Sequence, residues 1–254
     1  MITREDLVRL ALDVTGLTEE RWNDLLETLK DDASMNRVMR EDWARSPRES
    51  EEAIREYYRE SDIWFANTWS HGVGALLGMA KFDWPAQLRP WQKRFVQDFK
   101  IQGRILDYGG GFFNDTYQLV THGFRVSVAE VKGPVTEYLK RYRALAKLED
   151  HVEVVEVNGD FPLSETYHGV ACFETLEHLL KPLDMVSHFH DHLDAGQPFA
   201  LSVSFGDTPH APYHVSRNAR LGDEKVFSEE LEKIGFRSHW KGSENHQQIW
   251  RAAA

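Results

Sequence analysis

The sequence predicts an α/β protein with a doubly wound, mostly parallel sheet that follows an all-helical N-terminal extension. Residues 1–92 show helical spacing of apolar side chains and contain no β-rich run. From Arg104 onward, short apolar or β-branched runs alternate with segments of helical composition, which is the pattern of a parallel sheet with crossover helices. Three consecutive glycines, at residues 109–111, follow the first of these runs and indicate a tight turn between a strand and a helix.

Composition favours a folded protein of the cytoplasm. At 254 residues, of which 41% are hydrophobic, the chain can fill a sizeable core. Its formal net charge of -11 opposes tight binding to a polyphosphate, so we expect no nucleic-acid partner. Cys172 is the only cysteine, which excludes an intrachain disulfide or a thiolate metal cluster. The charged start MITREDLVRL argues against a secretory signal, and we expect a cytoplasmic location.

The N-terminal extension, residues 1–92, is expected to form several helices. Apolar faces recur at helical spacing at Leu7, Leu10, Ala11 and Val14, and then at Trp22, Leu25, Leu26 and Leu29. Ser46-Pro47 suits a helix start, and the helix would continue from Glu52 to Tyr58. The apolar run from Ile63 to Ala80 contains polar residues, so we predict a buried or site-lining helix, with no membrane partner.

The second part of the chain, residues 93–254, carries the predicted sheet. The boundary lies near Pro90, and a helix expected over Trp91–Phe99 could belong to either part. The predicted strands are RILDY, RVSVAE, VEVVEV, GVACFE and FALSVSF, which begin at residues 104, 125, 152, 169 and 199.

The glycine-rich segment ILDYGGGFFND joins the first predicted strand to a helix. Gly109, Gly110 and Gly111 lack Cβ atoms, so this loop can turn sharply and let a ligand approach its backbone and the helix N-terminus. Asn114 or Asp115 can cap that helix. A tight turn without a ligand is the alternative interpretation of the glycines when they are considered alone.

An acidic residue ends the second predicted strand. Glu130 lies twenty-three positions after Asp107 and would emerge beside the glycine loop, at the carboxyl edge of the sheet. A carboxylate there can accept hydrogen bonds from both hydroxyls of a ribose, as in nucleoside-binding sheets at their topological switch point. A solvated acid at a strand end is the alternative, but the coincidence with the glycine loop favours a ribose-bearing cofactor.

The glycine pattern separates two classes of ribose-bearing cofactor. A dinucleotide fingerprint has a third glycine that enters the helix, where this chain has Asn114. Asp107 precedes the loop and would repel a pyrophosphate, but it could hold the ammonium of an amino-acid moiety or brace the loop. The pattern therefore favours S-adenosylmethionine over NAD.

In these features the segment from Arg104 to Arg251 resembles the class I S-adenosylmethionine-dependent methyltransferases, in particular the branch that acts mostly on small molecules. LDYGGG resembles the first motif of the family, VAE its acidic strand end, and NGDFP the turn after the third strand. GVACFETLEHLLKP resembles the fourth strand with an E-x-L-E-H pattern. The resemblance implies seven strands, in which GFRSHW and HQQIWRA supply the last two and the last strand is antiparallel.

The resemblance also implies which residues hold the cofactor. Asp160 would contact the adenine amino group, and Glu177 and His178 complete the E-x-L-E-H pattern that begins at Glu174. The implied cofactor-binding residues are Asp107, Gly109, Gly110, Gly111, Glu130, Val131, Gly159, Asp160, Phe161, Phe173 and Glu174.

Two positions depart from the family pattern. Phe113 stands where the first motif commonly has a further glycine, so we expect the methionine tail to pack differently and Phe112 or Phe113 to shape the pocket. The turn before the fifth strand is Gly196-Gln197-Pro198, where a glycine pair is usual.

Methyl transfer is an in-line displacement that depends mainly on positioning the acceptor in a dry pocket. A general base helps when the acceptor is a hydroxyl or a protonated amine, and imidazole suits that role. His178 is the first candidate, with a structural or helix-capping histidine as the alternative, and His210 and His214 are the next candidates. The last two have a metal-ligand spacing, but Pro212 argues against a helix there and no third ligand is apparent, so we expect no metal.

The aromatic segment YYRESDIWFANTWSHG of the extension is expected to form a lid over the pocket. Aromatic faces can attract a sulfonium or stack on a flat acceptor. The candidate lid and substrate residues, together with Tyr213 of a later loop, are Tyr57, Tyr58, Trp64, Asn67, Trp69 and His71. The alternative is that the rings anchor the extension on the sheet as ordinary core, which we prefer for Trp64 and Trp69.

The sequence thus favours an enzyme that methylates oxygen, nitrogen or carbon on a small-molecule acceptor. Two alternatives stay open: a methyltransferase of peptides or proteins, and a catalytically silent cofactor-binding partner that regulates another enzyme. NAD-dependent oxidoreduction remains an alternative only because doubly wound sheets host both chemistries. The helices within Met1–Leu29 would cover the acceptor or form a homodimer contact.

Overall fold

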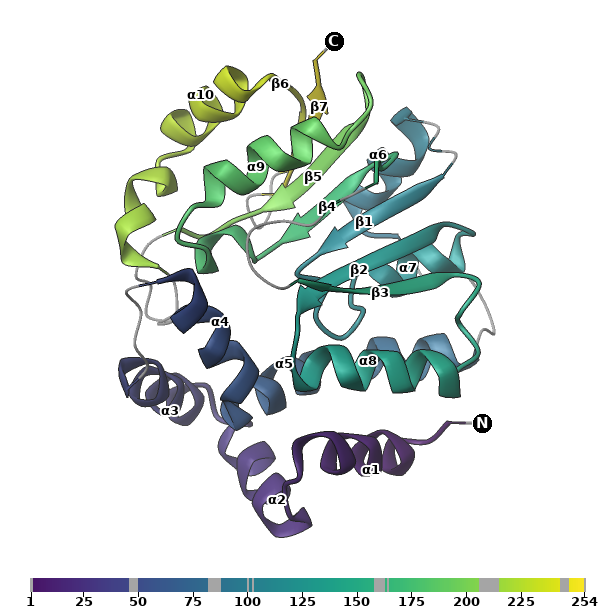
Figure 1. Cartoon of the computed structure of the whole chain (residues 1–254), viewed down its shortest axis with the longest axis vertical. Helices are drawn as coiled ribbons and strands as arrows, with labels where there is room; N and C mark the ends of the chain where they lie inside the picture. The colour runs from purple at the N-terminus through teal and green to yellow at the C-terminus, as the bar shows by residue number, and fades with distance from the viewer. Residues whose placement is uncertain are drawn as a thin grey trace.

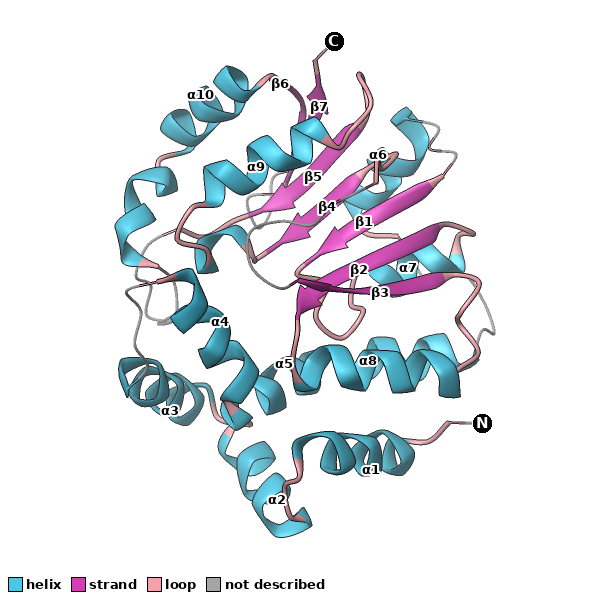
Figure 2. Cartoon of the chain, viewed as in Figure 1, coloured by secondary structure: helices cyan, strands magenta, loops and turns pink. Residues whose placement is uncertain are grey.

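The structure of this chain is a computed structural model that places helices on both faces of a central sheet (Figures 1 and 2). It describes residues 2–45, 50–81, 88–99, 101, 103–157, 163, 165–205, 215–242 and 247–253.

Seven strands form the sheet, in the order β3-β2-β1-β4-β5-β7-β6. Strand β7 pairs antiparallel with β5 and with β6, and the other neighbouring strands pair parallel. The predicted doubly wound, mostly parallel sheet with an antiparallel last strand is therefore confirmed. The strands are β1 (Arg104–Tyr108), β2 (Arg125–Val131), β3 (Val152–Val157), β4 (Val170–Phe173), β5 (Pro198–Ser202), β6 (Phe236–Lys241) and β7 (Gln248–Ala252).

Strand β5 is shorter than the predicted run, which extends to Phe205. The backbone N–H of Glu174 donates to the carbonyl of Ser202 at 3.0 Å, which is the last bond between β4 and its neighbour. The backbone N–H of Ser204 instead donates to the Glu177 carboxyl at 3.2 Å. The chain thus leaves the sheet where β4 no longer offers a partner.

Two hydrophobic clusters cover the two faces of the sheet. Successive side chains along a strand point to opposite faces of the sheet, so Ile105 of β1 belongs to one cluster and Leu106 to the other. The first cluster includes α6 (Pro90–Phe99), α7 (Thr116–Thr121) and α8 (Pro134–Leu145). The second includes α9 (Pro182–Asp191) and α10 (Glu224–Ile234). Two short 3₁₀ helices, η1 (Leu176–His178) and η2 (Ser216–Gly222), follow β4 and precede α10.

The N-terminal extension contains five helices among its described residues. They are α1 (Arg4–Thr15), α2 (Glu19–Thr28), α3 (Asp32–Arg45), α4 (Glu51–Glu60) and α5 (Asp62–Lys81). Helix α4 begins later than expected: the Ser50 hydroxyl accepts the N–H of Ala53 at 3.1 Å and caps the helix. The expected start at Ser46-Pro47 lies outside the described residues.

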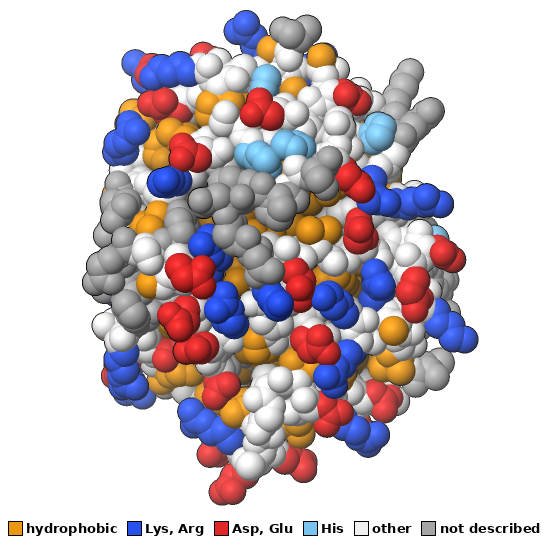
Figure 3. Space-filling model, in the orientation of Figure 1, with side chains coloured by type: hydrophobic (Ala, Val, Ile, Leu, Met, Phe, Trp, Pro, Cys, Tyr) orange, Lys and Arg blue, Asp and Glu red, His pale blue; other side chains and the backbone are white. Residues whose placement is uncertain are grey.

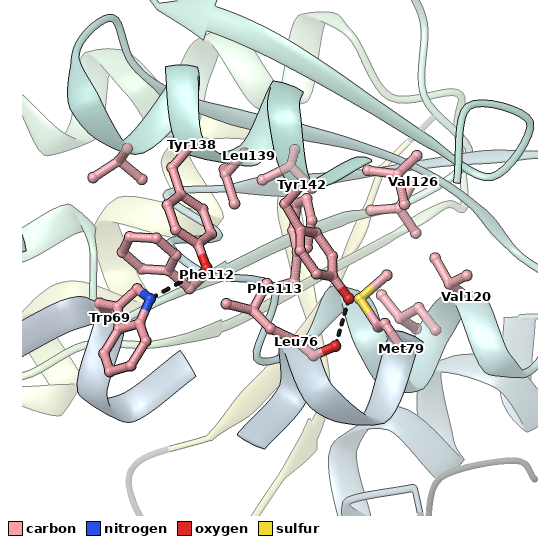
Figure 4. Packing of buried hydrophobic residues seen from close by; sticks show 14 of the residues in the cluster. Trp69, Leu76, Met79, Phe112, Phe113, Val120, Val126, Tyr138, Leu139 and Tyr142 are labelled. Carbon is pink, nitrogen blue, oxygen red and sulfur yellow. Dashed lines mark hydrogen bonds between the residues drawn. The ribbon is translucent and has the colours of Figure 1, made fainter. Parts of the chain in front are cut away.

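The extension shares its core with the sheet. Trp69 of α5 donates its Nε1–H to the Tyr138 hydroxyl of α8 at 3.2 Å, and the hydroxyl of Tyr142 bonds to the carbonyl of Leu76 (Figure 4). Helix α1 packs beside α8 at the bottom of Figure 1. Helix α6 crosses the boundary expected between residues 92 and 93 and packs against β5 and β7.

No helix in the described ranges combines the length and the apolarity that a membrane span requires. This holds for α5, which contains the apolar run of the extension. On the face shown in Figure 3, Lys and Arg side chains are interspersed with Asp and Glu.

Candidate functional site

The loops after β1 and β4 meet at the carboxyl edge of the sheet. The two strands are neighbours, and β2 lies on the other side of β1, so the strand order reverses between β1 and β4. A Cβ atom built on Gly109 would lie 2.2 Å from Oγ1 of Thr175, which follows β4. Open α/β sheets bind their ligands at such a switch point.

The glycine loop, residues 109–111, has a backbone that a ligand can approach because no side chain covers it. Gly109 and Gly111 have φ angles of 70° and 48°, in the left-handed region. A Cβ atom on Gly110 would lie 2.8 Å from Cγ of Asp107. Helix α5 lies directly against this loop, since a Cβ atom on Gly111 would lie 3.2 Å from Cγ2 of Thr68.

Phe112 and Phe113 belong to the hydrophobic core, and the expectation that one of them shapes the pocket stays a prediction. Phe113 takes a φ of 67°, in the left-handed region that few residues with a side chain adopt. Its ring lies 6.0 Å from that of Tyr142, and the ring of Phe112 lies 5.0 Å from that of Tyr138 (Figure 4). Both rings fill space between α5 and α8.

Glu130 reaches the glycine loop from β2. Its carboxylate accepts the backbone N–H of Gly111 at 3.2 Å and that of Val131 at 2.9 Å. Removal from water raises the pKa of Glu130, and these two hydrogen bonds oppose the rise. Glu130 therefore lies beside the glycine loop, as predicted. After accepting these two hydrogen bonds, its carboxylate has lone pairs left for further donors.

Asp107 is buried at the end of β1, where it accepts the hydroxyl of Thr116 at 2.5 Å. Burial, and then the charge of Asp115, raise the pKa of Asp107 to about 7. The carboxyl of Asp107 thus binds the first residue of α7, and its roles toward the glycine loop and the cofactor stay predictions. No pattern in the sequence indicates that Thr116 is the partner of Asp107.

Asp115 precedes α7 but does not cap it with its side chain. The carboxylate instead forms an ion pair with Arg89 at 3.3 Å and accepts the Nε2–H of Gln92 at 3.3 Å. Burial raises the pKa of Asp115, and the guanidinium of Arg89 opposes that rise. Asp115, one of the two predicted cap residues, therefore occupies the N-cap position of α7, but its side chain binds Arg89 and Gln92 and makes no capping hydrogen bond.

The end of β4 carries a second group of predicted site residues. Glu174 has a φ of 47°, which is unusual for a residue with a side chain, and its carboxylate accepts the Ser202 hydroxyl at 2.7 Å. The Phe173 ring lies 4.3 Å from the ring of Trp91 of α6. Burial, and the nearby charge of Glu174, raise the pKa of Glu177.

The structure brings His178 together with two predicted lid residues. The Tyr58 hydroxyl lies 2.8 Å from Nδ1 of His178, and the ring centroids of Tyr58 and Trp64 lie 5.6 and 5.5 Å from the imidazole. Tyr57 packs behind them, with its ring 4.8 Å from that of Trp43. Two rings of the aromatic segment, those of Tyr58 and Trp64, therefore contact the first candidate base.

Three further lid candidates lie on α5. Asn67 is buried, and its Oδ1 has no hydrogen bond to any described residue. His71 is exposed. Trp69 is fully buried and donates to the Tyr138 hydroxyl, which agrees with the core anchor preferred for it over a lid residue.

Several predicted site residues lie outside the described residues: Gly159, Asp160, Phe161, His210, Tyr213 and His214. Within the described part of the chain, no group of three His, Cys, Asp or Glu side chains is arranged to hold a metal ion.

Comparison with solved structures shows that the chain has the class I methyltransferase fold. An O-methyltransferase family protein from Burkholderia thailandensis matches with a TM-score of 0.57 at 10% identity, over 88% of this chain and 72% of that one. The mitomycin 7-O-methyltransferase MmcR matches with a TM-score of 0.53 at 15% identity, over 78% of this chain and 60% of that one.

A third structure is the glycopeptide N-methyltransferase MtfA complexed with S-adenosylhomocysteine. It matches with a TM-score of 0.51 at 16% identity, over 67% of this chain and 91% of that one. No protein-family model matches the sequence, and no curated protein matches it significantly.

Proposed function

We propose that this chain is an S-adenosylmethionine-dependent methyltransferase that acts on a small-molecule acceptor. The observation that carries the proposal is the contact between Glu130 and the N–H of Gly111 at the switch point of the sheet. It joins the carboxylate expected to bind a ribose to the loop expected to admit the cofactor backbone. The shared fold with O- and N-methyltransferases, one of them bound to S-adenosylhomocysteine, supports the same cofactor.

The charges around the loop fit a cationic cofactor. Neither Asp107 nor Glu130 forms an ion pair with a described residue, although both have pKa values raised by burial. An ammonium or sulfonium group would offset this excess of buried acid, whereas the pyrophosphate of NAD would add to the repulsion. A side chain at position 110 would collide with Asp107. Because Gly110 has none, its backbone is exposed for contact with the cofactor.

S-adenosylmethionine, when bound, supplies a methyl group that is activated for attack by a nucleophile. The side chain of Glu130 would accept the ribose hydroxyls, and the glycine loop would let the cofactor approach the backbone. His178 would take a proton from an acceptor hydroxyl or ammonium, which leaves a lone pair on the atom to be methylated. Aromatic side chains around His178 suit an acceptor with a flat apolar surface.

The proposal is tested by titration calorimetry of the full chain with S-adenosylhomocysteine. We expect binding in the micromolar range, and we expect Glu130→Ala to weaken it by about 1–3 kcal/mol because the ribose loses a charged acceptor. Glu156→Ala is the matched control. Glu156 lies on β3 directly opposite Glu130 of β2, but its carboxylate forms an ion pair with Lys140 at 2.8 Å. This control should leave the affinity unchanged.

Gly109→Arg gives a second test, because any side chain at Gly109 would meet Thr175. We expect this variant to lose binding while its circular dichroism spectrum stays that of a folded protein. Absence of binding by the unmodified chain, or tighter binding of NAD than of S-adenosylhomocysteine, would refute the proposed cofactor.

A further inference from the structure

Asn67 of α5 has a buried side-chain amide whose oxygen is not used within the described part of the chain. The residue is 6% exposed, and its Oδ1 has no hydrogen-bond partner there. Its backbone carbonyl, in contrast, accepts the Ser70 hydroxyl at 2.7 Å. An unpaired polar atom in the interior costs free energy, and asparagine is a poor helix former. Packing and helix formation therefore do not explain an asparagine at this position.

The neighbours of Asn67 on α5 show which way its side chain points. Residues three or four positions apart lie on one face of a helix. Trp64, three positions earlier, has its ring 5.5 Å from the imidazole of His178. Gly78 lies about three turns further along the same face, where a Cβ atom would be 2.5 Å from the ring of Tyr117. The face that carries Asn67 is thus turned toward the segments that follow β4 and β1.

Asn67 also lies at the level of the glycine loop. The next residue of the helix, Thr68, has its Cγ2 3.2 Å from a Cβ atom built on Gly111. The backbone N–H of Gly111 is in turn the group that Glu130 accepts. Gly111 therefore contacts both the carboxylate proposed to bind the ribose and the turn of α5 that carries Asn67.

The chemistry of the cofactor indicates which of its ends reaches α5. The sulfur of S-adenosylmethionine carries both the methyl group and the amino-acid chain, so these two lie on the same side of the ribose. The proposed function brings the methyl group to an acceptor beside His178, and α5 contacts His178 through Trp64. With its ribose at Glu130, the cofactor would therefore extend its amino-acid end toward α5.

The amino-acid end has one ammonium and one carboxylate group. A side-chain amide suits both, because its oxygen accepts hydrogen bonds from N–H groups and its NH₂ group donates to a carboxylate oxygen. An acidic side chain would repel the carboxylate, and a basic one would repel the ammonium. Asp107 and Glu130 already place two acids near the loop, so a neutral side chain adds hydrogen bonds there without adding charge.

We propose that the amide of Asn67 binds the amino-acid end of S-adenosylmethionine, with Oδ1 accepting a hydrogen bond from the ammonium group. This inference rests on the proposed function, which supplies the cofactor. It makes α5 a part of the cofactor site. The extension then contributes to binding in addition to its packing against the sheet.

Titration calorimetry of the full chain with two ligands tests the inference. S-adenosylhomocysteine contains the amino acid, whereas 5′-methylthioadenosine has the same adenosine and sulfur but only a methyl group in its place. Asn67→Leu nearly keeps the size of the side chain and removes the amide. We expect it to weaken the binding of S-adenosylhomocysteine by about 10- to 100-fold, because the ammonium loses its acceptor. Its affinity for 5′-methylthioadenosine should stay that of the unmodified chain, which also shows that the variant is folded.

Two further variants are the controls. Asn36→Leu makes the same change on α3, where Oδ1 of Asn36 also has no partner among the described residues, and it should leave both affinities unchanged. Glu130→Ala should weaken the binding of both ligands, because both contain the ribose.

Unchanged affinity of Asn67→Leu for S-adenosylhomocysteine would overturn the inference. An equal loss of affinity for both ligands would also overturn it, because such a loss does not depend on the amino-acid end. Equal affinities of the unmodified chain for the two ligands would have the same meaning. A chain that binds neither ligand would instead overturn the proposed function.

Discussion

The buried carboxyl of Asp107 lies near two other acidic residues, Asp115 and Glu130, and its titration makes the stability of the chain depend on pH. Asp107 is 2% exposed, and its pKa rises from an ordinary value of 3.8 to about 7 through burial and the charge of Asp115. The folded chain therefore holds this proton more tightly than the unfolded chain. The stabilisation from the bound proton is complete below pH 3.8 and is lost as the pH rises through about 7.

Asp107→Asn removes this titration while an amide oxygen can still accept the Thr116 hydroxyl. We expect the gain in the free energy of unfolding, relative to the unmodified chain, to be larger at pH 8 than at pH 5 by about 2 kcal/mol. Urea unfolding at the two pH values measures it. Glu156→Gln is the control: the hydrogen bond from Lys140 lowers the pKa of Glu156 from its ordinary value of 4.5, so its stabilisation is present at both pH values and the loss in this variant should be nearly equal at pH 5 and pH 8. Equal gains at both pH values for Asp107→Asn would contradict the assignment.

Helix α5 is the element that joins the extension to the glycine loop. Its residue Thr68 faces Gly111, and its residue Gly72 touches Phe112, where a Cβ atom would lie 2.2 Å from the Cβ of the phenylalanine. Helix and loop approach so closely because Gly72 has no side chain at the contact. The position of the loop, and of the N–H that Glu130 accepts, therefore depends on the packing of this helix.

Gly72→Ala should separate α5 from the loop. We expect it to lower the free energy of unfolding by about 1–3 kcal/mol through overpacking and to weaken the binding of S-adenosylhomocysteine. Gly74→Ala in the same helix is the matched control, because nothing lies within 4 Å of a Cβ atom there. That change should be neutral or stabilise the helix by up to about 1 kcal/mol. Thermal unfolding and calorimetry of both variants would show the difference, and equal effects would refute the packing argument.

At the scale of the whole molecule, the extension and one face of the sheet form a single hydrophobic cluster. Leu7, Trp22 and Trp69 of the extension belong to the same cluster as Val126 and Tyr138 of the second part of the chain. A division at residues 92 and 93 would cut through α6 and leave apolar side chains of both parts exposed to water. We therefore propose that residues 1–92 depend on the sheet for their stability, although they form a separate block in the sequence.

This arrangement predicts cooperative unfolding. Urea transitions followed by tryptophan fluorescence and by far-ultraviolet circular dichroism should coincide. Tyr138→Phe removes the acceptor of the Trp69 indole N–H and should lower the free energy of unfolding by about 1 kcal/mol with both probes. A separate early transition of the extension would show that it folds independently.

Local patterns in the sequence predicted most of the strands of the sheet and the placement of Glu130 beside the glycine loop. Strand β1 has the predicted bounds, and β2 extends the predicted run by one residue, because runs of apolar or β-branched residues bounded by turn residues are local signals. The position of Glu130 beside the glycine loop also followed from strand order, since parallel strands end at the same edge of a sheet. The family resemblance added the expectation of seven strands, which is confirmed.

Contacts between distant segments could not be read from the order of residues. Phe113 stands where the first motif commonly has a glycine, and only the fold shows that its ring packs in the core, 6.0 Å from the ring of Tyr142. Trp69 and Tyr58 stand in one aromatic segment, yet one anchors the core and the other meets His178. These roles depend on which segments the fold places side by side, because burial and hydrogen-bond partners are set by packing across the whole chain.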